Sequence, residues 1–413
     1  MPARRFQRPP DVTLGEPHPN DYEQLRTSAA VFHSDAHLLV LARYHDCAAA
    51  LRNPRLGRGL VGRPAQPRTA NGADPELRKA FFDRGGDSML LTDPPQHGRL
   101  RKLVSRAFTP NRVAALRPAV TESVGRLLDG QEGEVDMLKA LAFPLPNDVI
   151  GQLVGVPEAD RAGFEQLVHT SSAGLEPTVD VGTIRAAMAA PDVLQAYFTN
   201  LLAERRRLPG SDLLSGLAAA AENDDRLTDH EITSTAILLF AAGFETTTNL
   251  IGNGLLALLT HPEEMDRLRA DPSLAPSAVE ELLRWDSPVQ LNLRTALEDT
   301  EVAGEGIGAG QSVLILQGSA NRDPERFVDA DHLDLGRTDN VPLSFGWSAH
   351  HCLGAGLARL EGEVVFTALA QRFAAMELLE VPEWRPGLTF RGLAALPVRL
   401  TPVLESAIRA VDG

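Results

Sequence analysis

Cysteine is almost missing from this chain of 413 residues, which has two, Cys47 and Cys352. Sparse thiols are typical of a reducing compartment, so one disulfide is conceivable, a disulfide framework is excluded, and a cytoplasmic location is predicted. No window approaches the ~18 apolar residues of a membrane span, and no apolar segment follows the charged N-terminus as in a signal peptide. The sequence therefore predicts a soluble protein with no membrane partner.

Basic residues are too few to balance the acidic ones, since 40 Lys and Arg face 55 Asp and Glu for a formal net charge of −15. This surplus argues against nucleic acid as a general partner, although it permits a local basic patch. Aromatic residues make up 5% of the chain and hydrophobic residues 43%, so we expect a large core and an apolar cavity. One domain over residues 1–413 is predicted, with residues 1–20 as an irregular arm.

A stretch from 342 to 356, Pro-Leu-Ser-Phe-Gly-Trp-Ser-Ala-His-His-Cys-Leu-Gly-Ala-Gly, holds the most informative residue, Cys352. Its glycines allow the backbone to turn tightly and approach a bulky group. A helical apolar pattern starts just after Cys352, which places this cysteine at a helix N-terminus, where a thiolate is favoured. A lone cysteine is more often an inert buried residue. A zinc site at His350, His351 and Cys352 would lack the spaced ligand set and second cluster that such sites need.

The spacing F-G-x-x-x-H-x-C-x-G around Cys352 resembles the haem-thiolate loop of the cytochrome P450 family. The resemblance implies a mainly α-helical, triangular prism fold with a small β region, in which haem b lies between a long central helix and this loop. It makes Cys352 the ligand of the iron, and Phe345, His350 and Gly354 neighbours of the haem. The family usually has glycine where this chain has Ser348, so we expect a slightly different local turn.

The strongest helical pattern begins at Thr228, which forms a capping box with Glu231, and runs to Thr260. Its middle is apolar on all sides, which predicts that the helix is buried through the core. Glu245 and Thr246 interrupt this apolar middle. Burying them without partners is costly, so the inconsistency indicates a functional site.

Two interpretations of this segment are open from the residues alone. The threonine hydroxyls could bond back to the preceding turn and merely bend the helix. Alternatively, Ala242-Gly-Phe-Glu-Thr is similar to the oxygen-activating A-G-x-[D/E]-T element of the resembled family. By that match Thr246 hydrogen-bonds dioxygen, Glu245 relays protons from solvent, and Ala242 contacts the haem. A hydroxyl beside a carboxylate suits the delivery of protons.

Basic side chains that could bind anions precede and follow this helix. His97 and Arg101 lie four positions apart on one face of a helix whose start is predicted within residues 92–97. This is either a solvated basic face or a site for paired carboxylates. In the resembled family the D-P-P-x-H-x-x-x-R segment binds one haem propionate, and Arg294 matches the arginine at the other. The resemblance implies that His97, Arg101, Arg294 and His350 together neutralise the two propionates.

The sequence also predicts a structural ion-pair network, a long loop, strands and the lining of a substrate pocket. Glu281 and Arg284 form an E-x-x-R pair, which the resemblance implies is a buried structural ion-pair network with Arg337 as its third member. Strand patterns follow Pro288. Composition predicts a long loop over residues 53–90, and it leaves open whether this loop is disordered or is a functional segment such as a lid over the active site. The residues predicted to line the substrate pocket are Met89, Leu90, Leu238, Ala242, Val289, Leu291, Asn292 and Leu393.

The motifs occur in the order of the resembled family over nearly the whole chain. They predict a monooxygenase that hydroxylates or epoxidises an apolar small molecule, a polyketide, macrolide or peptide intermediate of antibiotic biosynthesis, free or bound to a carrier protein. No flavin or iron–sulfur motif is present, so electrons are expected from ferredoxin and ferredoxin reductase, docking near Arg106, Arg112 and Arg359. Two alternatives are a same-fold haem enzyme that couples phenols or uses peroxide, and a catalytically silent haem-binding partner protein.

Overall fold

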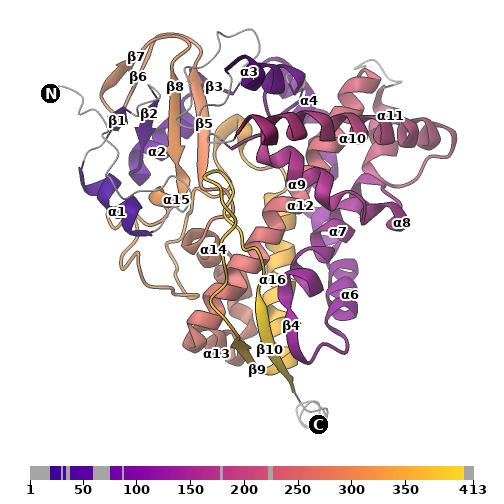
Figure 1. Cartoon of the computed structure of the whole chain (residues 1–413), viewed down its shortest axis with the longest axis vertical. Coiled ribbons are helices and arrows are strands. Elements are labelled where there is room, and N and C mark those ends of the chain that lie inside the picture. The colour runs from indigo at the N-terminus through magenta and orange to yellow at the C-terminus, as the bar shows by residue number, and fades with distance from the viewer. Residues whose placement is uncertain are drawn as a thin grey trace.

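The computed structural model describes residues 19–28, 31–33, 38–58, 75–85, 88–176, 180–221 and 227–403, and the arm predicted over 1–20 lies almost wholly outside them. Helices dominate the described residues, as the sequence predicted (Figure 1). They are α1 Pro19–Ser28, α2 Tyr44–Arg52, α3 Pro75–Arg84, α4 Gln96–Val104, α5 Pro110–Ala114, α6 Arg117–Leu128, α7 Pro144–Val154, α8 Glu158–Arg161, α9 Glu165–Ala173, α10 Val181–Arg207, α11 Leu213–Ala221, α12 Asp229–Thr260, α13 Pro262–Ala270, α14 Ala275–Trp285, α15 Gln317–Ala320 and α16 Ala355–Arg372.

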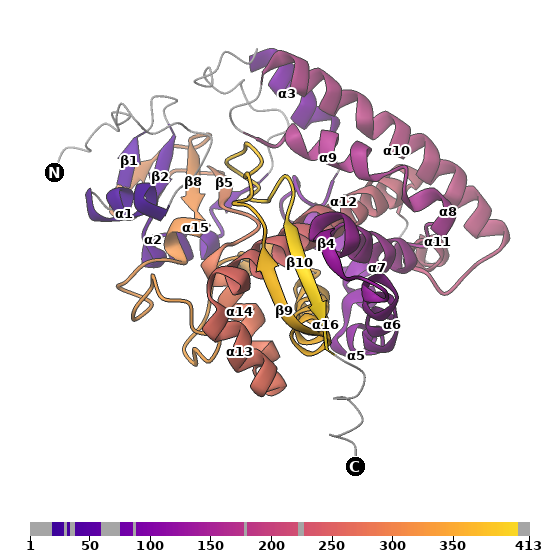
Figure 2. The same ribbon diagram turned by 60° about the horizontal axis from the view of Figure 1, so that its bottom comes forward.

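Helix α12 crosses the middle of the molecule with α16 alongside it (Figures 1 and 2). The predicted capping box is present, because the Thr228 hydroxyl accepts the Glu231 backbone N–H at 3.2 Å and the Glu231 carboxylate accepts the Thr228 N–H at 2.9 Å. The N-terminal half of α12 shares a core with α7, α10 and α11. Its C-terminal half packs with α6, α14 and α16. The helix is therefore held on all sides, and its middle lies between two cores.

Three small sheets make up the β region. The largest has the strand order β1 (Val31–His33), β2 (Leu39–Leu41), β8 (Ser312–Leu316), β5 (Leu291–Ala296) and β3 (Leu56–Gly57). It lies at the side of the molecule opposite α10 and α11 (Figures 1 and 2). The second joins β4 (Gly133–Asp136), β10 (Pro397–Pro402) and β9 (Phe373–Leu378), and the third pairs β6 (Thr300–Val302) with β7 (Glu305–Ile307).

The long loop predicted over residues 53–90 was wrong where the structure describes it. It contains the short strand β3 and the ten-residue helix α3, which packs against α10. Pro75 at the helix start and Glu76 in the first turn are ordinary start signals. The Gly- and Pro-rich composition averaged over the whole stretch concealed them. Residues 59–74 and 86–87 of this stretch lie outside the described part of the chain.

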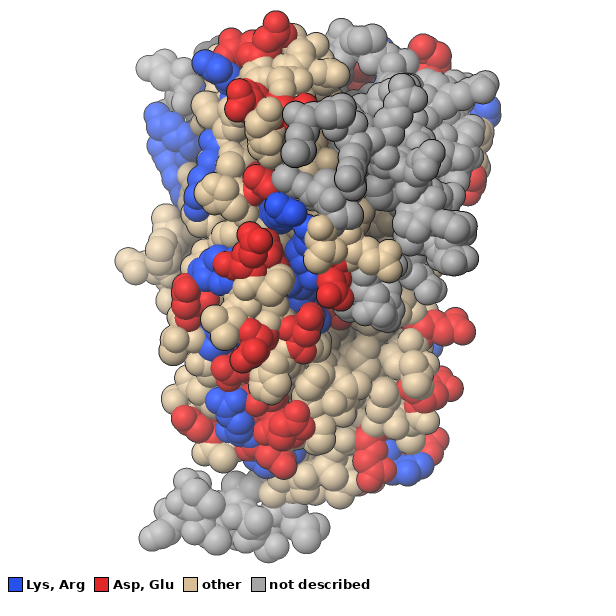
Figure 3. Space-filling model, turned by 90° about the vertical axis from the view of Figure 1, so that its left-hand side faces the viewer, with Lys and Arg blue, Asp and Glu red and all other residues tan. Residues whose placement is uncertain are grey.

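The surface beside α1 carries acidic and basic side chains interspersed over its described residues (Figure 3). The excess of acidic residues is thus not gathered on one part of this face. Among the described residues, no helix combines the length and apolar character needed to cross a membrane.

Candidate functional site

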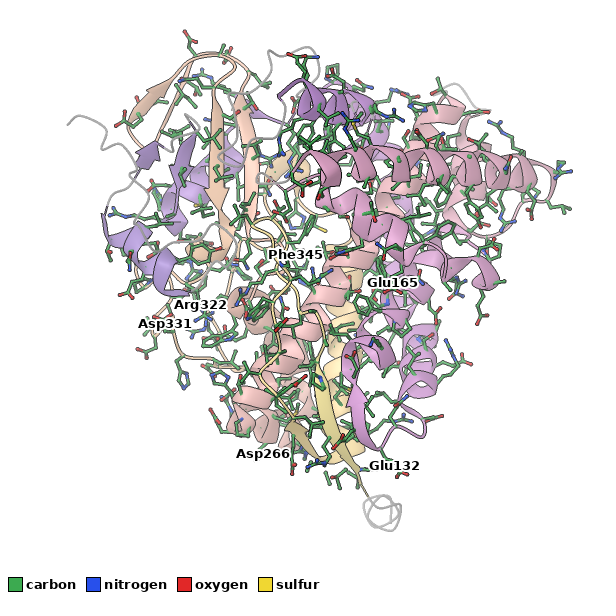
Figure 4. The ribbon with its side chains drawn as sticks, viewed as in Figure 1. Glu132, Glu165, Asp266, Arg322, Asp331 and Phe345 are labelled. Atoms are coloured by element: carbon green, nitrogen blue, oxygen red, sulfur yellow. The ribbon has the colours of Figure 1, made fainter. Side chains whose placement is uncertain are left out.

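One cavity of about 660 Å³ lies between α12, β5 and the loop that leads into α16. Phe345, on its wall, lies near the middle of the molecule (Figure 4). The cavity brings together residues from five separate chain segments that the sequence had singled out. They are Met89, Leu90, His97, Arg101, Leu238, Ala242, Glu245, Thr246, Val289, Leu291, Asn292, Phe345, His350, Cys352 and Gly354.

Cys352 lies just before α16, as its predicted position at a helix N-terminus requires. Its backbone N–H donates to the Phe345 carbonyl at 2.8 Å, which closes the loop. Burial raises the pKa of the Cys352 thiol, opposed by the backbone N–H groups of Gly354 and Ala355 and by the charge of Arg101. Donors and positive charge therefore converge on a sulfur that lines the cavity, an arrangement that suits a negatively charged sulfur.

The loop before Cys352 turns through two residues in the left-handed region, Gly346 with φ 65° and Ser348 with φ 57°. Glycine adopts this conformation without steric cost, whereas a serine there is strained. The predicted difference at Ser348 thus takes the form of backbone strain at a position where glycine would be relaxed.

The loop is fastened to the scaffold through hydrogen bonds to α14. The Ser344 hydroxyl donates to the Leu283 carbonyl at 2.8 Å. Next to Leu283, Arg284 forms two hydrogen bonds with Glu281, at 2.7 and 2.8 Å, and both side chains are completely buried. Arg337 donates to the same carboxylate at 3.1 Å, so the predicted third member of this network is in place.

His97 and His350 lie together at the edge of the cavity, with ring centroids 4.2 Å apart. Burial, then the neighbouring His350 and Arg101, lowers the pKa of His97 to about 4. Arg101 donates to the His351 carbonyl at 2.6 Å. Helix α4 begins at Gln96, within the predicted start segment 92–97, but without the side-chain cap that was expected there. The preceding residues instead carry Asp93 toward this cluster.

Several buried donors in this cluster have no partner. Arg294 is 3% exposed, lies behind the cavity wall on β5, and its Nη1 makes no hydrogen bond. The Nε2 of His350 also lacks a hydrogen bond and lies 3.7 Å from the Asp93 carboxylate. Buried unpaired donors are costly and rare in native proteins. Their arrangement fits a ligand that brings carboxylates to this edge while a metal meets Cys352, as haem does.

The Thr246 hydroxyl donates to the Ala242 carbonyl at 2.7 Å, so the back-bonded arrangement considered from the sequence is present. Thr246 nevertheless lines the cavity. The neighbouring Glu245 is 4% exposed and also reaches the cavity wall. The two functional groups therefore lie side by side at the middle of α12.

Two residues that the sequence analysis missed hold Glu245. Arg385 donates to its Oε1 at 2.7 Å, and the Nδ1 of His169 on α9 lies 3.6 Å from its Oε2. Burial raises the pKa of Glu245, but the hydrogen bond with His169 and the charge of Arg385 outweigh it, so the net pKa lies below its ordinary value. No spacing in the sequence could have identified these partners, because both come from distant segments.

Leu393 was predicted to line the substrate pocket, and this was wrong. It is 2% exposed, packs in the core shared by α14 and α16, and pairs with Trp384 through an isolated bridge. The same segment contributes Thr389 and Phe390 to the cavity instead. The Glu176 carboxylate fixes them by accepting their backbone N–H groups at 2.8 and 3.1 Å.

The basic residues expected to dock an electron donor differ in their surroundings. Arg106 and Arg112 are exposed. Arg359 pairs with Glu280, and its guanidinium carbon lies 4.5 Å from the Phe345 ring centroid. Arg359 is thus tied to the Cys352 loop rather than extended into solvent.

Comparisons with known proteins agree on one family. The family model described as Cytochrome P450 matches residues 182–386. Cytochrome P450 107B1 of Saccharopolyspora erythraea is 41% identical over 366 residues, 87% of this chain and 88% of that protein. The polyketide biosynthesis cytochrome P450 PksS of Bacillus subtilis is 40% identical over 374 residues, 88% of this chain and 89% of that protein. The solved structure of P450BioI with a hexadec-9Z-enoic acid ligated acyl carrier protein has a TM-score of 0.84 and 35% identity, over 92% of this chain and 98% of that chain.

Proposed function

Since this chain belongs to the cytochrome P450 family, we propose that it is a haem b monooxygenase that hydroxylates or epoxidises an apolar small molecule. The proposal rests on one observation. A cysteine, a hydroxyl next to a carboxylate, and a cluster of cationic side chains with unpaired donors meet at a single cavity.

In this proposal Cys352 binds the haem iron, and His97, Arg101, Arg294 and His350 bind the propionates, with Phe345, Ala242 and Gly354 against the ring. Haem with a thiolate ligand supplies the activation of dioxygen and the cleavage of its O–O bond. The protein supplies the mainly apolar cavity, the fixed sulfur and the protons.

Glu245 and Thr246 are proposed to deliver those protons. Glu245 takes them from the solvent side, where the His169 side chain is 48% exposed. It passes them to the Thr246 hydroxyl, which releases the Ala242 carbonyl and donates into the cavity. A threonine in a helix has two accessible rotamers for this exchange, because its hydroxyl can bond the preceding turn or leave it.

An apolar natural-product intermediate is the proposed substrate. Met89, Leu90, Leu238, Val289 and Leu291 line the cavity, and burial of apolar surface favours a hydrophobic ligand there. The similarity to a cytochrome P450 of polyketide biosynthesis supports a polyketide, macrolides included, and a peptide intermediate is the other substrate class proposed. The similarity to a P450 bound to an acyl carrier protein makes a carrier-bound substrate a second form of the same proposal.

Electrons are proposed to come from a ferredoxin and its reductase, because the sequence has no flavin or iron–sulfur motif. Arg106 and Arg112 are the exposed candidates for docking. The proposal treats residues 1–413 as one catalytic domain, and the cytoplasmic location stays a prediction.

The absorption spectrum of the dithionite-reduced, carbon monoxide-bound protein tests the proposal. We expect a strongly red-shifted Soret band that Cys352→Ser abolishes and that Cys47→Ala, at the other cysteine, retains. An unshifted band in the wild type would contradict thiolate ligation. With ferredoxin, its reductase and NADPH, oxygenated product should then form from candidate substrates, whereas a silent haem-binding protein would form none.

A further inference from the structure

Arg58, from a segment that the sequence analysis treated as loop, faces Arg294 across two strands. Strands β3 and β5 are antiparallel, with Leu56 opposite Ala296 and Gly57 opposite Thr295. Extending this register by one residue places Arg58 opposite Arg294. Like charges opposite each other in a sheet are destabilising. An anion held between the two guanidiniums would offset this repulsion.

Both guanidiniums are short of partners. The Nε of Arg58 and the Nη1 of Arg294 are buried without a hydrogen bond. Arg58 also lines the cavity, and its Nη2 donates to the Asn292 side chain. Burial lowers the pKa of Arg58 to about 10, and burial followed by the charge of Arg58 lowers the pKa of Arg294 to about 9. For both guanidiniums, the charge of Asp93 offsets only part of this lowering.

Asp93 is the carboxylate that acts on both guanidiniums. Its Oδ1 accepts the backbone N–H of Arg58 at 2.8 Å, so it fixes the Arg58 backbone. The charged groups that act on the His97–His350 pair are the guanidiniums of Arg58, Arg101 and Arg294 and the carboxylate of Asp93. The two histidines are counted as neutral. The net charge of the charged groups, two positive units, equals the charge of two propionates, and without Arg58 the balance would fall short by one.

We propose that Arg58 binds a haem carboxylate together with Arg294, so that the guanidinium of the residue just after β3 and that of a residue on β5 hold one propionate. This rests on the proposed function, because it requires haem in the cavity. It explains why a repulsive arginine pair is built into the sheet, and it adds a fifth basic side chain to the four that the sequence predicted.

The test compares haem release from the wild type, Arg58→Gln and Arg58→Lys to an excess of apomyoglobin. Arg55→Gln is the matched control, since Arg55 lies in the same segment but pairs with Glu298 at the surface, with side chains 57% and 63% exposed. Loss of a charge-assisted hydrogen bond predicts that Arg58→Gln releases haem roughly 10-fold faster or more. Arg58→Lys should release haem at a rate between those of the wild type and Arg58→Gln, and Arg55→Gln should release it at the wild-type rate.

A second loading separates propionate binding from a structural role of Arg58. The full chain is loaded with haem dimethyl ester, whose propionates carry no charge. We expect the release rates of the ester from Arg58→Gln and from the wild type to agree within about 2-fold. The ester has no propionate charge for Arg58 to bind, so the substitution removes no such interaction. An equal loss with haem b and with the ester would overturn the proposal in favour of a structural role.

Unchanged release of haem b from Arg58→Gln would also overturn the proposal. If the same variant lost affinity for a carboxylate-bearing ligand, Arg58 would bind substrate instead. These outcomes differ from failure of the proposed function, which would show as the absence of the red-shifted Soret band in the wild type.

Discussion

The Nη2 of Arg385 lies 2.7 Å from the Oε1 of Glu245, although 140 positions separate the two residues. The same nitrogen donates to Asn249 at 2.5 Å, and the Nη1 of Arg385 lies 3.0 Å from the Nδ1 of His169. Glu245 is 4% exposed, whereas the His169 side chain is 48% exposed. An imidazole in contact with solvent is thus joined to the carboxylate beside Thr246.

Replacement of Arg385 by Gln should disturb proton delivery in a pH-dependent way. The pKa of Glu245 is below its ordinary value, so its ion pair stabilises the protein at neutral pH and is lost only as the pH falls through that lowered pKa. Without the charge of Arg385, the effect of burial is opposed less strongly, so the pKa of Glu245 rises. The acidic limb of the profile of product-formation rate against pH should move to higher pH, and the rate of product formation should fall on the order of 10-fold.

Steady-state rates and product formed per NADPH, followed against pH, measure this effect. Arg391→Gln is the control, because Arg391 lies in the same segment, pairs with Asp286 and lies 3.5 Å from the Trp384 ring centroid. Identical pH profiles for Arg385→Gln and the wild type would show that Arg385 does not act on Glu245.

Thr246→Ala should divert electrons away from product. Removal of the hydroxyl that is proposed to donate protons into the cavity should lower product per NADPH by about 10-fold or more, with hydrogen peroxide formed instead. Thr260→Ala on the same helix is the matched control, since its hydroxyl makes the same kind of bond, to the Leu256 carbonyl at 2.9 Å. If both variants kept full coupling, Thr246 would only shape the helix.

Glu281→Gln should destabilise the fold strongly. Its carboxylate is fully buried and bonded to Arg284 and Arg337, and breaking a buried pair costs about 3–5 kcal/mol. The adjacent Glu280→Gln should cost ~0–1 kcal/mol, because Glu280 and Arg359 are partly exposed. Urea unfolding of the two variants measures the difference, and equal losses would contradict the scaffold role.

Ser348→Gly should stabilise the Cys352 loop. Glycine relieves the strain of the left-handed backbone at residue 348 but adds conformational entropy to the unfolded chain. The net result should be a rise of about 0.5–1 kcal/mol in the free energy of unfolding. Ala349→Gly, one position later, should instead destabilise, because residue 349 has no positive φ to relieve. The unfolding free energy of both variants, measured in urea, checks the opposite signs.

Sequence alone was sufficient for the features that depend on neighbours along the chain. The capping box of α12, the glycine-rich turn before Cys352 and the pairing of Glu281 with Arg284 are local, so spacing predicts them. The motif order then assigned the family. Composition failed in residues 53–90, because a ten-residue helix is short compared with the stretch over which Gly and Pro were averaged.

Tertiary structure decided the partners of the functional groups. Arg385 reaches Glu245 from a segment without regular structure, and Arg58 meets Arg294 only because β3 adds to β5. Leu393 packs in the core while Thr389 and Phe390 face the cavity, which the bonds to Glu176 determine. Burial, charge balance and unpaired donors are properties of side chains brought together from distant segments, so no local pattern in the sequence carries them.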